Sequence, residues 1–253
     1  MSGRLFVIGL GPGDPAQITP EASEAVSAAS HLLGYKPYLD RLDLRADQTA
    51  LASDNREELA RAGAALALAA KGETVAMVSG GDAGVFAMAA AVCEAIDAGP
   101  PDWRAVDLVV VPGITAMLAV AARAGAPLGN DFCAVSLSDN LKPWPVIEKR
   151  LRLAAEAGFA MALYNPISKA RPHQLGNAFS ILRAVLPGSI PVVFGRGVGR
   201  ADERLAVVSL EEAMPEMADM ATCIIVGNAH TRIVERGARP ALVYTPRSVP
   251  ADG

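Results

Sequence analysis

The chain has 253 residues, enough for one large or two modest domains with a sizeable core. Its net charge of −4 argues against nucleic acid as the main partner. The longest uncharged run, 108–122, is shorter than a bilayer span and contains Pro112 and Gly113, so we expect no transmembrane helix. The apolar stretch at the N-terminus is too short for a signal peptide. Much of the 51% hydrophobic content is alanine, which suits helices packed closely on sheets.

The three cysteines, Cys93, Cys133 and Cys223, are odd in number, widely spaced and set in apolar surroundings. This pattern is typical of reduced core residues and not of disulfides or metal ligands. We therefore expect a cytoplasmic protein without a metal site.

The first motif of the chain is a glycine-rich stretch, Gly9–Asp14, which follows the apolar run 5–8. Four apolar residues closed by glycines predict a strand buried on both faces. Thr19 is a candidate N-cap and Pro20 suits the first position of a helix. Because Pro12 and Pro15 prevent a helix from beginning inside the motif, this loop differs from the dinucleotide-binding turn, which opens directly into a helix. It is either a plain connection or a stiff wall of exposed backbone against a flat ligand.

The rest of the first half alternates helices and strands, which predicts a mostly parallel sheet covered on both faces. We expect a helix over 21–33 with a short strand around Leu32, and a second helix that begins at Arg56, is capped by Asp54 and is ended by Gly72. The remaining elements are a strand over 74–78, a helix over 85–96, a buried strand over 108–111 and a helix from about 116 to 124.

The pattern changes after the segment 125–130, where strands resume with helices between them. The predicted strands cover 133–137, 160–164, 191–194, 205–208, 223–226 and 241–244. Because 205–210 follows a turn, the second half should contain some antiparallel pairing. We predict two α/β domains, with a mostly parallel sheet in 1–115 and a mixed sheet in 116–246, a cleft between them and a tail over 247–253.

Four unusual segments follow predicted strands: Gly9–Asp14, 79–86, 112–116 and 164–174. Ligands of open α/β sheets bind beyond the carboxyl ends of the strands, so these segments are expected to form one site. Asp82 can bind a hydroxyl or amino group, or can cap a helix. Thr115 is equally suited to bind a ligand or the local backbone.

No nucleophile or metal motif is present, because the chain has no G-x-S-x-G and no P-loop, and His31, His173 and His230 are scattered. His31 is expected at the end of a helix, in a structural role. Basic residues gather in the second half, where they either form solvated surface or face an acidic substrate. They are Lys169, Arg171, His173, Arg196, Arg200 and Arg232.

The glycine-rich stretch, Ser79-Gly80-Gly81-Asp82, Pro112-Gly113-Ile114-Thr115-Ala116 and the two-domain layout together resemble the tetrapyrrole methylases, the class III S-adenosylmethionine-dependent methyltransferases. The resemblance covers nearly the whole chain. Three further segments, Gly34–Tyr38, Tyr164–Pro172 and Val226–Arg232, are similar to those of the ring-contracting members that act in cobalamin synthesis.

The resemblance implies a homodimer of two-domain subunits with S-adenosyl-L-methionine bound in the cleft between the domains. Carried over by motif, the cofactor-binding residues would come from all four strand-end segments and from two later positions. They are Leu10, Gly11, Pro12, Gly81, Asp82, Val85, Phe86, Thr115, Ala116, Tyr164, Asn165, Gly197 and His230.

The implied reaction methylates C17 of precorrin-3B and expels the C20 meso carbon as an appended acetyl group, giving precorrin-4. The carboxylates of the macrocycle would be held by Lys36, Lys169, Arg171, Arg196 or Arg232. Ring contraction also needs proton transfers, for which Asp14, His230 and Tyr35 are the candidates. Asp14 can instead simply cap its loop.

Three alternatives remain open at this point. The chain can be a methylase of the same family that acts on another carbon or on the cobalt-containing substrate of the anaerobic pathway, although no dedicated cobalt site is visible. It can be a nicotinamide-dependent oxidoreductase, against which the prolines of the first motif and the lack of an acidic residue after a second strand argue. It can also be a tetrapyrrole carrier without turnover.

Overall fold

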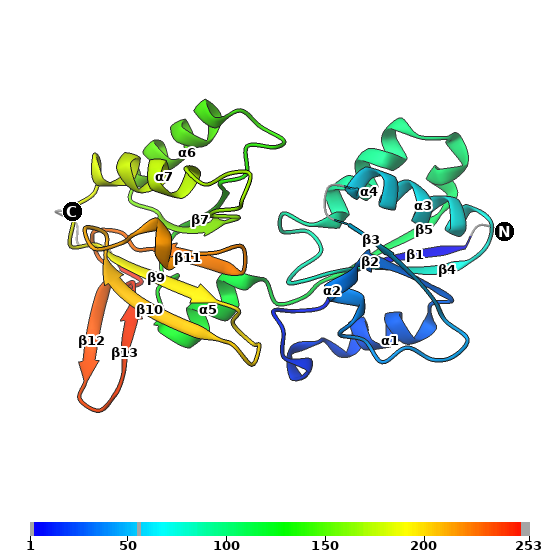
Figure 1. Cartoon of the computed structure of the whole chain (residues 1–253), viewed down its shortest axis with the longest axis horizontal. Coiled ribbons are helices and arrows are strands. Elements are labelled where there is room, and N and C mark those ends of the chain that lie inside the picture. Colours follow the sequence, from blue (N-terminus) through cyan, green and yellow to red (C-terminus); the bar gives the residue numbers. More distant parts are fainter. Residues whose placement is uncertain (1–2, 55–56, 249–253) are drawn as a thin grey trace. The chain divides into compact units, whose positions relative to one another are not determined.

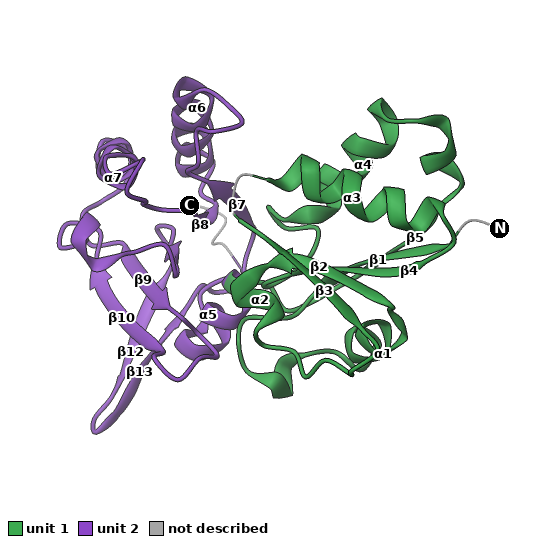
Figure 2. Ribbon diagram, turned by 45° about the vertical axis from the view of Figure 1, so that its right-hand side comes forward, with its two compact units in different colours: residues 1–116 green, residues 117–253 purple. Residues whose placement is uncertain are grey.

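The computed structural model describes residues 3–54 and 57–248. The chain forms two compact units, residues 1–116 and residues 117–253, which are coloured separately in Figure 2 and are described one at a time below. Arg56, the predicted start of a helix, and residues 249–253 of the predicted tail lie outside the described residues.

Unit 1 is built on a five-stranded sheet in which every neighbouring pair of strands is parallel, as predicted. In sheet order the strands are β3 (Thr49–Ser53), β2 (His31–Tyr35), β4 (Thr74–Ser79), β1 (Arg4–Gly9) and β5 (Asp107–Val111).

Helices cover both faces of this sheet because alternate residues of the central strands are apolar on both sides (Figure 1). Val75 and Met77 pack against α3 (Glu58–Ala70) and α4 (Met88–Ala98). Ala76 and Val78 face α1 (Pro20–Ala28) and the short α2 (Lys36–Leu39). The Thr19 hydroxyl accepts a hydrogen bond from the Ala22 amide at 3.1 Å, which confirms the predicted cap of α1.

Several predicted boundaries in unit 1 are wrong. Helix α1 ends at Ala28, and His31 begins strand β2, where its Nδ1 lies 3.0 Å from the Ser30 hydroxyl. A short 3₁₀ helix (Pro15–Gln17) follows the first motif, since Pro15 fits its first position and Asp14 caps it.

Further corrections concern the elements around α3 and α4. Asp54 does not cap α3, because Glu57 holds the N-cap position of this helix, where no side chain caps it. The Asp54 amide donates to the Glu57 carboxylate at 3.2 Å. Strand β3 was not expected. Helix α4 begins at Met88 and not at Val85, because Phe86 has a left-handed φ of 52° that interrupts a helix. Strand β5 is an edge strand and is only partly buried, with Val110 45% exposed.

Unit 2 contains the predicted mixed sheet, and its antiparallel pairing is confirmed. Strands β7 and β8 are parallel, whereas the β8–β11, β11–β9 and β9–β10 pairs are antiparallel. In sheet order the strands are β10 (Arg204–Ser209), β9 (Pro191–Arg196), β11 (Thr222–Val226), β8 (Ala160–Tyr164) and β7 (Phe132–Ser136).

Helices α6 (Trp144–Glu156) and α7 (Gln174–Arg183) cover one face of this sheet, with Leu151 and Phe179 in the core. On the other face, α5 (Ala116–Ala124) comes close to β9 because Gly195 has no side chain: a Cβ there would lie 2.8 Å from Cγ1 of Val120. A separate three-stranded sheet joins β12 (Arg232–Arg236), β13 (Arg239–Tyr244) and β6 (Gly125–Ala126). The sequence does not predict β12 or β6.

The cysteines differ in their surroundings. Cys223 is buried, and this burial raises the pKa of its thiol to about 12. Cys133 is half-buried and Cys93 is exposed, so the expectation of three core cysteines is wrong for Cys93. No helix of the described residues is long and apolar enough to cross a membrane.

Candidate cofactor site at the strand ends

Three of the predicted loops leave the same edge of the unit 1 sheet. Gly9 ends β1 opposite Ser79 of β4, and Ile8 lies opposite Val111, the last residue of β5. Because the three strands are parallel, the loops that follow them emerge side by side. The predicted meeting of the strand-end segments is confirmed for these three loops; the fourth, after β8, belongs to unit 2.

The loops pack backbone against backbone at three glycines. A Cβ on Gly9 would lie 2.6 Å from the carbonyl oxygen of Gly81 and 2.8 Å from the amide nitrogen of Gly113. A Cβ on Gly113 would lie 2.5 Å from the carbonyl oxygen of Gly9. Real Cβ atoms are not found so close to backbone, so a side chain at either position would force the loops apart.

A pair of hydrogen bonds joins the first loop to the second. The Gly11 amide donates to the Gly81 carbonyl at 3.0 Å, and the Gly81 amide donates to the Gly11 carbonyl at 2.8 Å. Both residues have left-handed φ angles, 68° and 69°, which glycine adopts without a steric penalty. The loops therefore form a short two-stranded bridge that has no side chains at its centre.

Asp82 ties the second loop to the third. One carboxylate oxygen accepts from the Gly84 amide at 2.8 Å and the other from the Gly113 amide at 3.0 Å. Asp82 is not a helix cap, because α4 begins only at Met88. Its position makes it a structural clamp of the site, whatever further ligand it contacts.

Two residues that the sequence did not single out also support the loops. The Arg41 guanidinium donates to the Leu10 carbonyl at 2.9 Å and to the Gly11 carbonyl at 3.4 Å. The ring of Tyr38 lies against Gly80, where a Cβ would be 2.8 Å from its Cε1. Tyr38 belongs to the motif 34–38 and could have been suspected, whereas nothing in the sequence links Arg41 to residues 30 positions away.

The other candidates in unit 1 surround these loops. Leu10 and Thr115 are buried, Pro12 and Val85 are half-buried, and Phe86 is 50% exposed. Ala116 begins α5. The space above Gly81 is narrow, since a Cβ there would be 3.7 Å from the Cα of Thr115.

The catalytic candidates of unit 1 have structural contacts as well. An oxygen of Asp14 accepts from the Ala16 amide at 2.9 Å, so this carboxylate does cap its loop. Tyr35 ends β2 and packs edge-on against Tyr38, with 5.6 Å between ring centroids. Lys36, a candidate for substrate carboxylates, is paired with Asp40 at 2.7 Å.

In unit 2, the loop after β8 is fixed from within. The Tyr164 hydroxyl accepts from the Met117 amide, at the start of α5, at 2.9 Å. Asn165 has a left-handed φ of 51° and donates from its side chain to the Ser136 hydroxyl at 2.9 Å. Arg171 is buried and donates to the Asn165 carbonyl at 3.0 Å. It therefore supports the loop, while Lys169 is exposed.

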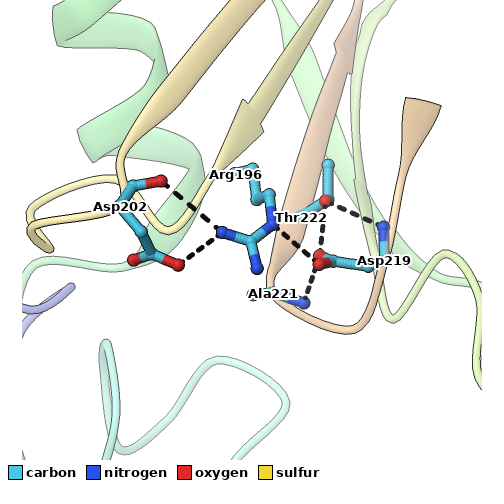
Figure 3. A network of polar contacts seen from close by, with 5 residues as sticks. All are labelled: Arg196, Asp202, Asp219, Ala221 and Thr222. Carbon is cyan, nitrogen blue, oxygen red and sulfur yellow. Dashed lines mark hydrogen bonds and ion pairs between the residues drawn. The ribbon is translucent and has the colours of Figure 1, made fainter.

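Arg196 ends β9 and lies between two carboxylates (Figure 3). It donates to Asp202 and, at 2.7 Å, to Asp219, and these bonds raise the pKa of the guanidinium. The bond from Arg196 lowers the pKa of the Asp202 carboxyl. Partial burial opposes the charged form of Asp219, but Arg196 and nearby donors still lower its pKa. Arg196 thus already has counter-charges, which makes it a poor ligand for a substrate carboxylate.

Unit 2 does not bring all of its predicted cofactor residues together. Gly197 bonds to the Ala221 carbonyl, before β11, and so lies at the sheet edge where β8 ends in Tyr164. His230 follows β11, which runs antiparallel to β8. The His230 amide donates to Asn228, whose side chain donates to Gly158, before the start of β8. His230 and Arg232 therefore lie at the opposite edge.

Comparison with known proteins identifies this fold. The family described as Tetrapyrrole (Corrin/Porphyrin) Methylases matches residues 4–214. The chain belongs to the tetrapyrrole methylase family. The resemblance drawn from the strand-end motifs is thereby confirmed. No group of three or more histidine, cysteine or acidic side chains that could hold a metal occurs in the part of the chain that the structure describes.

Individual relatives are close. The chain is 69% identical to a precorrin-3B C(17)-methyltransferase of a Sinorhizobium species, over 98% of this chain and 97% of the relative. It is 40% identical to a probable cobalt-factor III C(17)-methyltransferase of Salmonella typhimurium, over 96% of this chain and 98% of the relative. The crystal structure of the methyltransferase CobJ matches with a TM-score of 0.91 at 50% identity, over 97% of this chain and 100% of that one.

The clamp role of Asp82 can be tested by Asp82→Asn, which keeps one acceptor and turns an amide NH₂ toward a backbone N–H. We expect the free energy of unfolding in urea to fall by about 1–3 kcal/mol, because hydrogen bonds to a charged group are lost. The control is Asp40→Asn, which breaks only the exposed pair with Lys36 and should cost less than about 1 kcal/mol. Equal losses in the two variants would contradict the clamp.

Proposed function

We propose that this chain is an S-adenosyl-L-methionine-dependent C-methyltransferase of cobalamin synthesis, which methylates C17 of precorrin-3B and contracts the ring to give precorrin-4. The observation that carries the proposal is the 69% identity to a precorrin-3B C(17)-methyltransferase over 98% of the chain. The strand-end loops of unit 1 support it, because they present the expected motifs as one hydrogen-bonded surface.

The residues of this surface fit an adenosyl cofactor. Gly81 and Gly113 have no side chains and are half-buried, so a flat or extended ligand can contact their backbone, and Leu10 and Thr115 supply buried surface beside it. S-adenosyl-L-methionine supplies a methyl group that its sulfonium sulfur has already activated. The protein then has little covalent chemistry to perform.

The work of these residues is orientation and exclusion of water. Holding the carbon nucleophile in line with the methyl group can contribute on the order of 7–11 kcal/mol to the lowering of the barrier. Charge is lost from the sulfonium as the methyl moves, and a dry, apolar surface favours that change. The Asp82 and Arg41 contacts keep the loops in place so that the orientation is maintained.

Among the basic candidates for the carboxylates of the macrocycle, the structure favours some over others. Lys169 is exposed in the loop that follows β8, and no described residue pairs with its ammonium group. Arg171 positions the loop that carries Lys169, whereas Lys36 and Arg196 have acidic partners. We propose that Lys169 contacts substrate directly and that Arg171 acts through Asn165.

Proton transfer in the ring contraction is assigned to one of Asp14, Tyr35 and His230. Asp14 and Tyr35 lie at the carboxyl ends of β1 and β2, the edge that carries the glycine-packed loops. We therefore place Asp14 and Tyr35 before His230 as candidates. The variants to compare are Asp14→Asn, Tyr35→Phe and His230→Gln. For the residue that transfers the proton, the variant should no longer contract the ring but should still bind S-adenosylhomocysteine.

The direct test is to incubate the protein with S-adenosyl-L-methionine and precorrin-3B and to locate the new methyl by NMR. We expect a methyl at C17 and an acetyl-bearing, contracted ring, and we expect Lys169→Gln to raise the Michaelis constant for precorrin-3B about tenfold. A methylated product with an intact ring would overturn the proposal. Calorimetry should show that the protein binds S-adenosylhomocysteine and does not bind NADH.

We propose that the substrate is the metal-free precorrin-3B and not its cobalt-containing counterpart. The relative named for precorrin-3B is 69% identical to this chain, against 40% for the one named for cobalt-factor III. The same assay with the cobalt complex is the comparison, and faster turnover of that complex would reverse the preference.

We also propose that the protein is cytoplasmic, as its cysteine pattern suggests, and that it is a homodimer, as the family resemblance implies. Sedimentation at equilibrium should then give twice the 26.2 kDa mass of the chain. A mass equal to that of one chain would contradict the dimer.

A further inference from the structure

Arg61 is a buried cation that has no acidic partner among the described residues. It lies on α3 with only 7% of its surface exposed, and no described residue forms an ion pair with it. Its Nε donates to the Ser53 hydroxyl at 2.5 Å, one terminal nitrogen to the Asp54 carbonyl at 2.6 Å, and the other to the Met88 sulfur at 3.6 Å. Burying a charge without a counter-charge is costly.

The guanidinium has donors to spare. Of its five N–H groups, three are engaged by the contacts above, which leaves one on each terminal nitrogen without a partner among the described residues. One of the existing partners is a thioether, which is a weak acceptor. Two free N–H groups on a planar cation are suited to the two oxygens of a carboxylate.

A second donor without a partner among the described residues, the Ser79 hydroxyl, lies at the same ends of the strands as Ser53. Ser53 is the register partner of Tyr35 at the carboxyl ends of β3 and β2, and Ser79 ends β4 one residue after Val78, the partner of Gly34. Ser79 continues the alternation of Val75 and Met77, which pack against α3 and α4. The Ser79 hydroxyl is buried, with 4% of the residue exposed, and no described residue forms a hydrogen bond with it. A buried polar atom without a partner is unusual in a native protein.

There is room for a ligand at Arg61. A cavity of about 220 Å³ is bordered by Arg61, Ser53 and otherwise mostly apolar residues, among them Leu33 and Ala64. A water molecule takes about 30 Å³, so the cavity can hold a carboxyalkyl arm. Glu57 also borders it and would repel an anion, but this residue is exposed and its carboxylate accepts from the Asp54 amide.

We propose that Arg61 binds a carboxylate of the macrocyclic substrate, with the Ser79 hydroxyl as a further donor to the same substrate. The inference rests on the proposed function. It is supported by position, because Ser79 opens the second glycine loop and Met88, which touches Arg61, follows the same loop. Strands are about 4.8 Å apart, so Ser53 and Ser79, two strands apart, are about 10 Å from one another. A ligand with several carboxylates on its rim can reach both.

The test compares Arg61→Gln, Arg61→Lys and Ser79→Ala with the unaltered enzyme. We expect the Michaelis constant for precorrin-3B to rise about 10- to 100-fold in Arg61→Gln, with partial rescue in Arg61→Lys, which keeps the charge and loses the fork. In Ser79→Ala it should rise about three- to tenfold, while the free energy of unfolding stays the same or increases, because no bond is lost. This second variant carries the test if Arg61→Gln does not fold. The turnover number should change little.

The matched control is Glu57→Gln, which alters the same cavity and should lower the Michaelis constant or leave it unchanged. The cofactor also carries a carboxylate, so the affinities for S-adenosylhomocysteine and for methylthioadenosine, which lacks it, are measured by calorimetry. Both should be the same in Arg61→Lys as in the unaltered enzyme.

Three results would overturn the inference. The first is an unchanged Michaelis constant in Ser79→Ala and in the folded Arg61 variants while the unaltered enzyme forms precorrin-4. The second is a selective loss of S-adenosylhomocysteine binding, which would assign Arg61 to the cofactor. The third is an increase in Glu57→Gln equal to that in the Arg61 variants. No turnover by the unaltered enzyme would instead overturn the proposed function, and this inference with it.

Discussion

The close approach of three backbones at Gly9, Gly81 and Gly113 is the constraint on which the rest of unit 1 depends. Parallel strands bring the loops to one edge, but only the absence of side chains lets their carbonyl and amide groups come within contact of one another. The Gly11–Gly81 bridge and the Asp82 carboxylate then satisfy the polar groups that this approach buries. The result is three loops that are joined through their backbones, with no side chains at their closest contacts.

The same principle of local rigidity applies to unit 2. Arg171, Asn165 and Ser136 hold the loop after β8, and Tyr164 is bonded to the first turn of α5. Charged side chains at these strand ends form hydrogen bonds within the protein that hold the loops in place. Arg171 and Arg196 show that a basic residue at the end of a strand need not be free to bind a ligand, because internal acceptors neutralise or occupy it.

Much of the fold follows from the sequence because apolar periodicity and caps are local signals. β1, β4 and the Thr19 cap are clear in the residues themselves. The missed strands β3 and β12 are exposed at the edges of their sheets, and they owe their order to pairing with a neighbour and not to burial. Helix α4 begins at Met88 and not at Val85 because Phe86 has a left-handed φ angle, which cannot be predicted from its residue type.

The site is predictable to a similar extent. Three motifs at strand ends suffice to predict that the loops meet at one side of the sheet. The side-chain partners of Arg41, Arg61 and Arg196 lie far along the chain or on other elements, so only the structure shows that Arg196 bonds to carboxylates while the described partners of Arg41 and Arg61 are uncharged. The antiparallel direction of β11, which moves His230 to the other edge, is likewise a property of the folded sheet.

The most direct measurement of the central claim is the affinity for S-adenosylhomocysteine in two alanine variants, at a temperature where both are folded. Gly113→Ala places a Cβ 2.5 Å from the Gly9 carbonyl, whereas Gly158→Ala strains a left-handed φ of 78° in open space. The account predicts a dissociation constant at least about tenfold higher for Gly113→Ala and nearly unchanged for Gly158→Ala. Equal affinity in both variants would contradict the view that side-chain-free contact between the three loops forms the cofactor surface.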